Sequence, residues 1–139
     1  MKDIEILKSL EKRLKIKIGN FQEWDQENEG LNKKQLAKFD NSQNVEGLYL
    51  NSIGLEQIPE EVLKFKKLKT LHLFRNQLTT IPNELANLEH LEEVLFIENK
   101  ISHIPEEIVF KNNLKVLSIH QNPVKNIPEE VISLSLIHI

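Results

Sequence analysis

The dipeptide Ile-Pro recurs in this chain at a constant interval of 23 residues. The four copies are Ile58-Pro59, Ile81-Pro82, Ile104-Pro105 and Ile127-Pro128. A fixed period of roughly 20 to 50 residues is typical of proteins that stack one structural unit many times. Because each unit buries its apolar face against its neighbours, the period constrains the whole array and favours a binding surface over a catalytic pocket.

The same period places apolar residues in three slots ahead of each Ile-Pro. The first slot holds Val45, Leu68, Leu91 and Leu114, the second holds Leu48, Leu71, Val94 and Leu117, and the third holds Leu50, Leu73, Phe96 and Ile119. A mostly polar slot follows, which holds Ile53, Asn76, Asn99 and Asn122. The unit is therefore Leu-x-x-Leu-x-Leu followed by an asparagine.

This unit resembles the leucine-rich-repeat family, whose repeats follow the pattern LxxLxLxxNxL. The resemblance extends from Val45 to Ile139, about two-thirds of the chain. It implies an α/β fold, a right-handed β–α solenoid with one parallel sheet on its concave face. The repeat length and the Ile-Pro are similar to the short repeats of intracellular and bacterial members.

Elementary chemistry accounts for the slots. The alternating apolar residues predict a short strand in each copy, and the copies would pair into one parallel sheet. We expect a structural asparagine ladder, Asn76, Asn99 and Asn122, to bond backbone groups where the chain turns inward. Each proline fits the first position of a helix or 3₁₀ turn. The glutamates that follow suit the positive end of that helix, so we interpret them as structural rather than as a metal site.

Residues 1–44 do not follow the repeat. We expect Asp3 to cap a helix that runs to about Ile16, with Ile4, Leu7, Leu10 and Leu14 on its buried face. Phe21 and Trp24 are expected to pack beneath it. Lys34–Phe39 and the polar turn after it predict a hairpin strand that lies antiparallel on the first repeat strand. The prediction is one domain, with an N-terminal capping helix and hairpin strand over 1–44 and four repeats plus a truncated fifth over 45–139.

Two substitutions interrupt the slots. Ile53 replaces the asparagine of the first repeat, so that turn is expected to pack against apolar residues. In the return segment after the Ile-Pro, Lys111 stands at a position that is apolar in the other repeats. Phe110 is expected to fill that space in the core. Ile137 begins a fifth repeat two residues before the sequence ends. The apolar edge expected there suggests homo-association, or a fragment of a longer solenoid.

Composition narrows the classes of partner. The net charge of −3 favours neither nucleic acid nor an anionic membrane surface as a partner. The chain has no cysteine, which removes disulfides and thiolate chemistry. The N-terminus lacks the apolar run of a signal peptide, and no stretch reaches the roughly 20 apolar residues of a membrane span. We expect a cytoplasmic protein, unless a leader segment has been removed.

Candidate binding residues lie between the core slots, in three columns that face the concave side. The columns are Gly47, Thr70, Glu93 and Val116, then Tyr49, His72, Leu95 and Ser118, then Asn51, Phe74, Ile97 and His120. The core does not need apolar residues there, and contiguous exposed apolar side chains mark interaction sites. We therefore predict that the concave face binds a partner through Tyr49, His72, Phe74, Leu95, Ile97, Val116 and His120. The alternative is that a terminal segment covers them.

Catalysis is not indicated. His72 and His120 lie two strands apart, about 10 Å by strand spacing, which is too far for one metal ion. Ser118 and His120 have no orienting acid or oxyanion loop near them. No cofactor is expected. The leading hypothesis is a non-catalytic module that binds a protein or peptide, and the alternative is a structural, self-associating unit.

Overall fold

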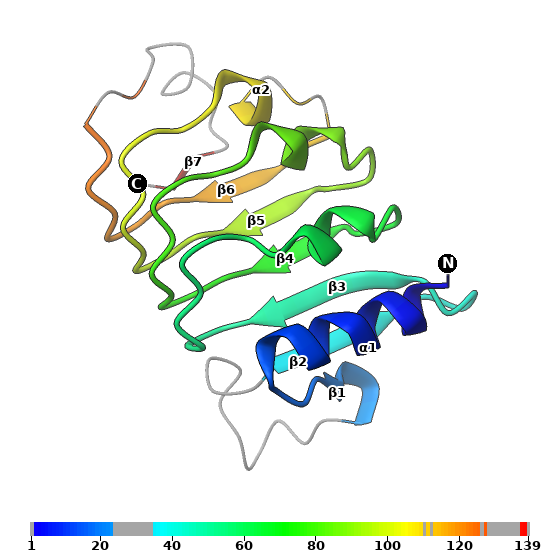
Figure 1. Ribbon diagram of the computed structural model, residues 1–139. Helices are drawn as coiled ribbons and strands as arrows, with labels where there is room; N and C mark the ends of the chain where they lie inside the picture. The colour runs from blue at the N-terminus through cyan, green and yellow to red at the C-terminus, as the bar shows by residue number, and fades with distance from the viewer. Residues whose placement is uncertain are drawn as a thin grey trace.

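The computed structural model describes residues 2–23, 35–109, 111, 113–125, 127 and 137–138 (Figure 1). The predictions for Trp24, Phe110, Pro128 and Ile139 lie outside these residues. Within the described part, strands form one sheet, and a layer of short helices covers one face of it. This is the leucine-rich-repeat solenoid that the family resemblance implies.

The sheet has seven strands, and their order in space is their order in the sequence. They are β1 (Gly19–Asn20), β2 (Gln35–Phe39), β3 (Val45–Leu50), β4 (Thr70–His72), β5 (Glu93–Leu95), β6 (Val116–Ser118) and β7 (Ile137–His138). Every neighbouring pair is parallel except β2 and β3, which form an antiparallel hairpin. From β3 to β6 the register advances by one repeat per strand, because Leu48 pairs with Leu71, Leu71 with Val94 and Val94 with Leu117.

Helical segments return the chain along the opposite, convex face (Figure 1). They are α1 (Asp3–Leu14), η3 (Glu60–Lys64), η4 (Asn83–Asn87) and α2 (Glu106–Val109), and η1 (Phe21–Glu23) follows β1. The prolines stand one position earlier than predicted. Pro59 and Pro82 are the N-caps of η3 and η4, with extended backbone, rather than first helical residues. Their carbonyls accept the first turn's hydrogen bonds, from Val62 and Leu85.

The slot residues fill the space between sheet and helices. The second-slot side chains of Leu48, Leu71, Val94 and Leu117 are completely buried. Phe65, Leu85 and Ile108 from the return segments are buried against the same core. Burying one such side chain contributes about 1.5–3 kcal/mol, so each repeat is stabilised mainly by contacts with the next one.

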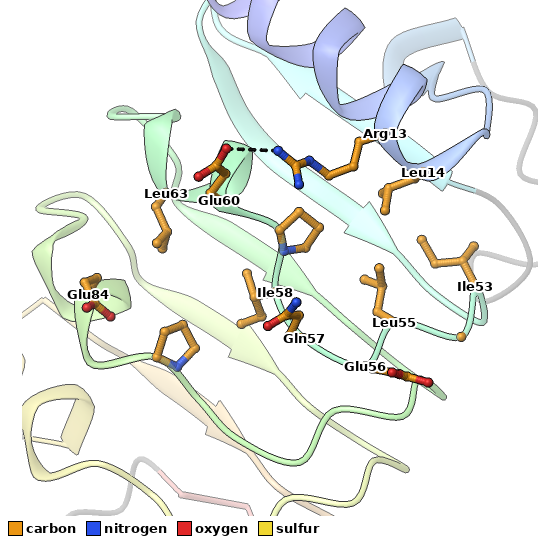
Figure 2. Close-up of a pocket in the computed structure, with 13 residues that line it drawn as sticks. Arg13, Leu14, Ile53, Leu55, Glu56, Gln57, Ile58, Glu60, Leu63 and Glu84 are labelled. Atoms are coloured by element: carbon orange, nitrogen blue, oxygen red, sulfur yellow. Dashed lines mark hydrogen bonds and ion pairs between the residues drawn. The ribbon is translucent and has the colours of Figure 1, made fainter.

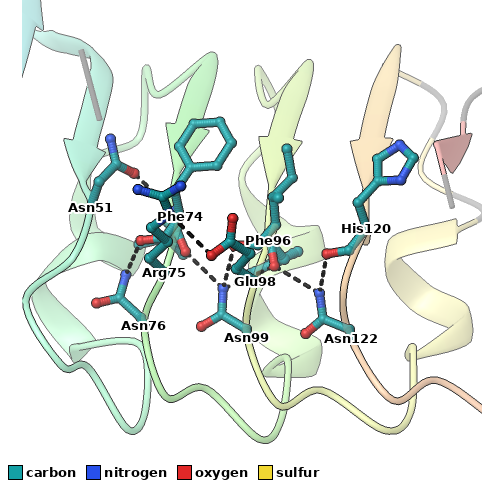
Figure 3. A network of polar contacts seen from close by, with 11 residues as sticks. Asn51, Phe74, Arg75, Asn76, Phe96, Glu98, Asn99, His120 and Asn122 are labelled. Atoms are coloured by element: carbon teal, nitrogen blue, oxygen red, sulfur yellow. Dashed lines mark hydrogen bonds and ion pairs between the residues drawn. The ribbon is translucent and has the colours of Figure 1, made fainter. Parts of the chain in front are cut away.

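The asparagine ladder connects consecutive coils through side-chain hydrogen bonds (Figure 3). The Asn99 amide nitrogen donates to the Leu73 carbonyl of the preceding coil at 2.8 Å and to the Phe96 carbonyl of its own coil at 2.9 Å. Its oxygen accepts the Leu78 N–H at 3.1 Å. Asn76 and Asn122 make the equivalent bonds. Each side chain therefore satisfies buried backbone groups of two coils at once.

The residue before each ladder position has a left-handed backbone. The φ angles are 57° at Ser52, 54° at Arg75, 58° at Glu98 and 58° at Gln121. None of them is glycine, although this conformation costs other residues roughly 1–2 kcal/mol. At Arg75, Glu98 and Gln121 the turn persists because the asparagine that follows makes hydrogen bonds on both sides of it.

The first repeat turns without its own asparagine. Ile53 is half-buried and packs against the core, as expected. Its N–H donates to the Asn76 side-chain oxygen at 3.1 Å, so the ladder of the next coil serves this turn too. Asn51 is completely buried, and its side-chain oxygen accepts the Phe74 N–H at 2.8 Å. Asn51, which the period places in the third concave column, therefore takes part in the coil-to-coil bonding.

Helix α1 differs in detail from the sequence expectation. Lys2 is its N-cap, and Asp3 is its first residue. The Asp3 carboxylate instead accepts the Val45 N–H at 2.8 Å, which ties the helix to β3. Ile4 is 45% exposed, and Ile6 takes the buried place predicted for it. The helix contacts η3, and Leu7, Leu10 and the half-buried Leu14 pack on the core as predicted.

An ion pair joins this helix to the first repeat. Arg13 donates to Glu61 at 2.7 Å and to Glu60 at 2.9 Å. Glu61 is only 3% exposed, whereas Glu60 is well exposed. A carboxylate this deeply buried depends on its cation, because an unpaired buried charge is strongly unfavourable. The cap is thus held by charge as well as by apolar packing.

Replacing Asn99 by alanine should destabilise the fold by about 3 kcal/mol or more, because it leaves several buried backbone groups without partners at roughly 1–3 kcal/mol each. Urea unfolding measures the loss. Asn113→Ala is the matched control, since Asn113 is exposed and makes one bond, to the Glu89 carbonyl. Equal losses in the two variants would contradict the structural role of the ladder.

Arg13→Ala should lower the urea midpoint clearly more than Glu60→Ala does. The first change leaves buried Glu61 without its cation, while the second removes only the exposed arm of the pair. If the two variants unfold at the same midpoint, the ion pair does not hold the cap.

Candidate functional site

The concave face of the sheet carries the predicted binding residues. The register places Gly47, Thr70, Glu93 and Val116 in one column and Tyr49, His72, Leu95 and Ser118 in the next. Phe74, Ile97 and His120 follow just after their strands. In Figure 3 the side chains of Phe74 and His120 point to the same side of the sheet.

These residues differ in exposure. Tyr49 is 7% exposed, His72 is 8% exposed, and Ser118 is buried as well. Phe74, Leu95, Ile97 and Val116 are half-buried, and we call these four residues the apolar patch. His120 is exposed at its margin. A partner can therefore reach the apolar patch and His120, whereas Tyr49 and His72 lie beneath the accessible surface.

A row of aromatic rings supports the apolar patch. Phe21 stacks on Tyr49 with the ring centroids 5.2 Å apart. Tyr49 meets His72 edge-on at 4.8 Å, and His72 meets Phe74 edge-on at 5.5 Å. These are favourable aromatic geometries, and they hold the Phe74 ring in place. A terminal segment was the expected alternative cover for the concave residues. Phe21, from the N-terminal segment, covers Tyr49 in this way.

His72 and Glu93 form the polar centre of the face. The His72 Nε2 lies 3.0 Å from a Glu93 carboxylate oxygen. A carboxylate can only accept, so Nε2 carries the proton. The His72 Nδ1 is buried and has no hydrogen-bond partner among the described residues. Burial lowers the pKa of His72, and the bond to Glu93 only partly opposes it. His72 is thus neutral near pH 7, and Glu93 keeps its negative charge.

Charged side chains border the apolar patch on both sides. At one end of the strands Lys69 pairs with Glu46 at 3.7 Å, and Lys115 pairs with Glu92 at 3.5 Å. At the other end Arg75 pairs with Glu98 at 3.0 Å. Each pair connects neighbouring coils. Exposed pairs of this kind contribute little stability, but they form a polar rim around an apolar centre.

The residues considered for a Ser-His site do not come together within the described part of the chain. Ser118 is buried, and the acid of this face, Glu93, bonds His72 rather than His120. No group of three or more His, Cys, Asp or Glu side chains that could hold a metal ion occurs in this part of the chain. The arrangement is suited to binding through apolar contact.

A groove on the convex side is a second concavity, with a volume of about 790 Å³ (Figure 2). It lies between the end of α1, the loop that follows β3, and the starts of η3 and η4. Its apolar lining includes Leu14, Ile58 and Leu63. Sequence reasoning missed this groove because it depends on where α1 packs, which the repeat does not encode.

Glu93 and Phe21 are the site residues that sequence reasoning undervalued. Glu93 was placed in a column but not among the binding residues, and Phe21 was assigned to the core beneath α1. The period could have identified Glu93 as the one acid in the three columns. No periodic signal could have placed Phe21, because it precedes the repeats.

Comparison with known proteins agrees with this architecture. The family described as Leucine Rich Repeat matches residues 67–88. No curated protein matches the sequence. A solved leucine-rich-repeat protein of Leptospira interrogans is 23% identical with a TM-score of 0.58, over 76% of this chain and 30% of that one. A chain of the Drosophila melanogaster SNF/U2A' complex is 19% identical with a TM-score of 0.48, over 72% and 71%.

The repeated strands, the asparagine ladder and the family match define a leucine-rich-repeat solenoid. The fold is therefore that of leucine-rich-repeat proteins, and residues 67–88 match the family itself. The chain spans less than a third of the Leptospira relative. Domains of this class generally mediate protein–protein interaction and are typically not enzymes. Among the described residues, no helix is long and apolar enough to cross a membrane.

Acid should destabilise the protein partly through His72. The unfolded chain takes up a proton on this histidine near its ordinary pKa of 6.5, whereas the folded state resists it. Stability is therefore present above about pH 6.5 and is lost as the pH falls below it. Urea unfolding at about pH 7 and about pH 5 should show a smaller loss in His72→Gln than in the wild type. A His72 NMR titration at or above 6.5 would refute this explanation.

Proposed function

We propose that this protein is a non-catalytic module that binds a protein or peptide across the concave face of its sheet. The main observation is that the apolar patch, Phe74, Leu95, Ile97 and Val116, remains partly exposed on a face where Tyr49, His72 and Ser118 are buried. Contiguous apolar surface with a polar rim is characteristic of interaction sites.

The support beneath the apolar patch strengthens this proposal. His72 and Tyr49 fix the Phe74 ring, so little side-chain freedom is lost when a partner covers it. The rim cations Lys69, Arg75 and Lys115 already have carboxylate partners. Apolar contact at the centre therefore provides the affinity, and the rim limits which partners fit.

The joint substitution of Phe74 and Ile97 by serine should weaken partner binding at least about tenfold, because central apolar residues carry most of the energy of such interfaces. The partner is first captured from a lysate of the source cells, and its affinity for each variant is then measured. Far-ultraviolet circular dichroism should be unchanged, since neither residue belongs to the buried slots.

The matched control replaces Ile58 and Leu63 by serine. Both are half-buried and apolar, and both line the convex groove. This variant should retain the partner. Loss of binding in the control, with retention in the Phe74 and Ile97 variant, would move the site to the convex side.

A second candidate, self-association through a strand edge, is favoured by the position of β7. This strand is the last in the sheet and pairs with β6 on one side. A strand edge can pair with another chain through its backbone. Sedimentation at increasing concentration should then show dimers or larger species, and a strict monomer at high concentration would argue against this candidate.

A further inference from the structure

Glu93 occupies the centre of the proposed binding face. It lies on β5, the middle strand of the repeats, with Thr70 and Val116 beside it in register and Leu95 two residues further along the same strand. Its side chain is 38% exposed, so part of the carboxylate reaches solvent. It is the one acidic residue in the three concave columns.

The charge of Glu93 is not neutralised within the described protein. Its partner at ion-pair distance among these residues is His72, which donates one hydrogen bond while remaining neutral near pH 7. The pair therefore carries one net negative charge. The same charge contributes, after burial itself, to the raised pKa of Tyr49, which lies two strands away on β3.

The nearby cations are engaged elsewhere. Lys69 pairs with Glu46, Lys115 with Glu92 and Arg75 with Glu98, all at the rim. A partner that covers the apolar patch removes water from Glu93 as well, because Leu95 and Val116 adjoin it. Burying a carboxylate without a counter-charge opposes binding, whereas a cation from the partner turns the same burial into a specific contact.

From this geometry we infer that the partner segment presents a lysine or arginine side chain to Glu93, next to apolar residues that cover Phe74 and Ile97. The inference rests on the proposed function and specifies the chemistry of its partner. It distinguishes a basic, apolar protein segment from an acidic one, which Glu93 would repel.

The test uses a displayed library of random linear peptides, selected on the wild-type chain and on Glu93→Gln. Peptides are kept if they lose binding to the Phe74 and Ile97 double serine variant. Glutamine keeps an oxygen that can accept the His72 bond and removes the charge, and equal urea midpoints confirm that folding is retained. Wild-type selections should enrich lysine or arginine beside apolar residues, and Glu93→Gln selections should not.

One selected peptide is then measured with its basic residue intact and with norleucine, or another uncharged isostere, in its place. For the intact peptide, Glu93→Gln should weaken binding about tenfold, whereas the uncharged peptide should bind both proteins equally. Patch-dependent peptides that lack a basic preference, or that show no such coupling, would overturn this inference and leave the proposed function standing. A selection that yields no peptide dependent on Phe74 and Ile97 would overturn both.

Discussion

The structure depends on how buried backbone groups are satisfied where each strand ends and the chain turns. A short strand exhausts its sheet partners within a few residues, yet the chain there remains in the interior. Asn76, Asn99 and Asn122 supply the missing donors and acceptors, and each reaches back to the preceding coil. These bonds also hold the left-handed residue before each asparagine. Because one side chain serves two coils, the turn geometry and the stacking of repeats are a single constraint.

This constraint assigns most of the repeated residues to the scaffold. Core slots, prolines and ladder residues are determined by stacking, so the remaining positions on the sheet are available for recognition. On the concave face these positions form an apolar patch supported by buried Tyr49 and His72, with Glu93 at its centre. The ion pairs at the rim repeat from coil to coil and leave Glu93 as the distinctive charge of the face.

The period of the sequence was sufficient to predict the strands of the repeats, their register and the two faces of the sheet, because every coil has the same structure. It could not predict features that depend on the cap. Asp3 bonds β3 instead of capping α1, Arg13 pairs with buried Glu61, and Phe21 covers Tyr49. Each contact joins residues far apart in sequence and occurs once, so no repetition signals it. For the same reason the exposure of Tyr49 was overestimated, since its cover comes from outside the repeats.

The location of the binding surface is tested most directly by methyl NMR of the chain with and without its captured partner. Leu95, Ile97 and Val116 report on the concave face, and Ile58 and Leu63 report on the convex groove. The partner should shift the methyl resonances of the first set and leave those of the second set unchanged. Shifts confined to Ile58 and Leu63, with the concave methyl groups unaffected, would contradict the account.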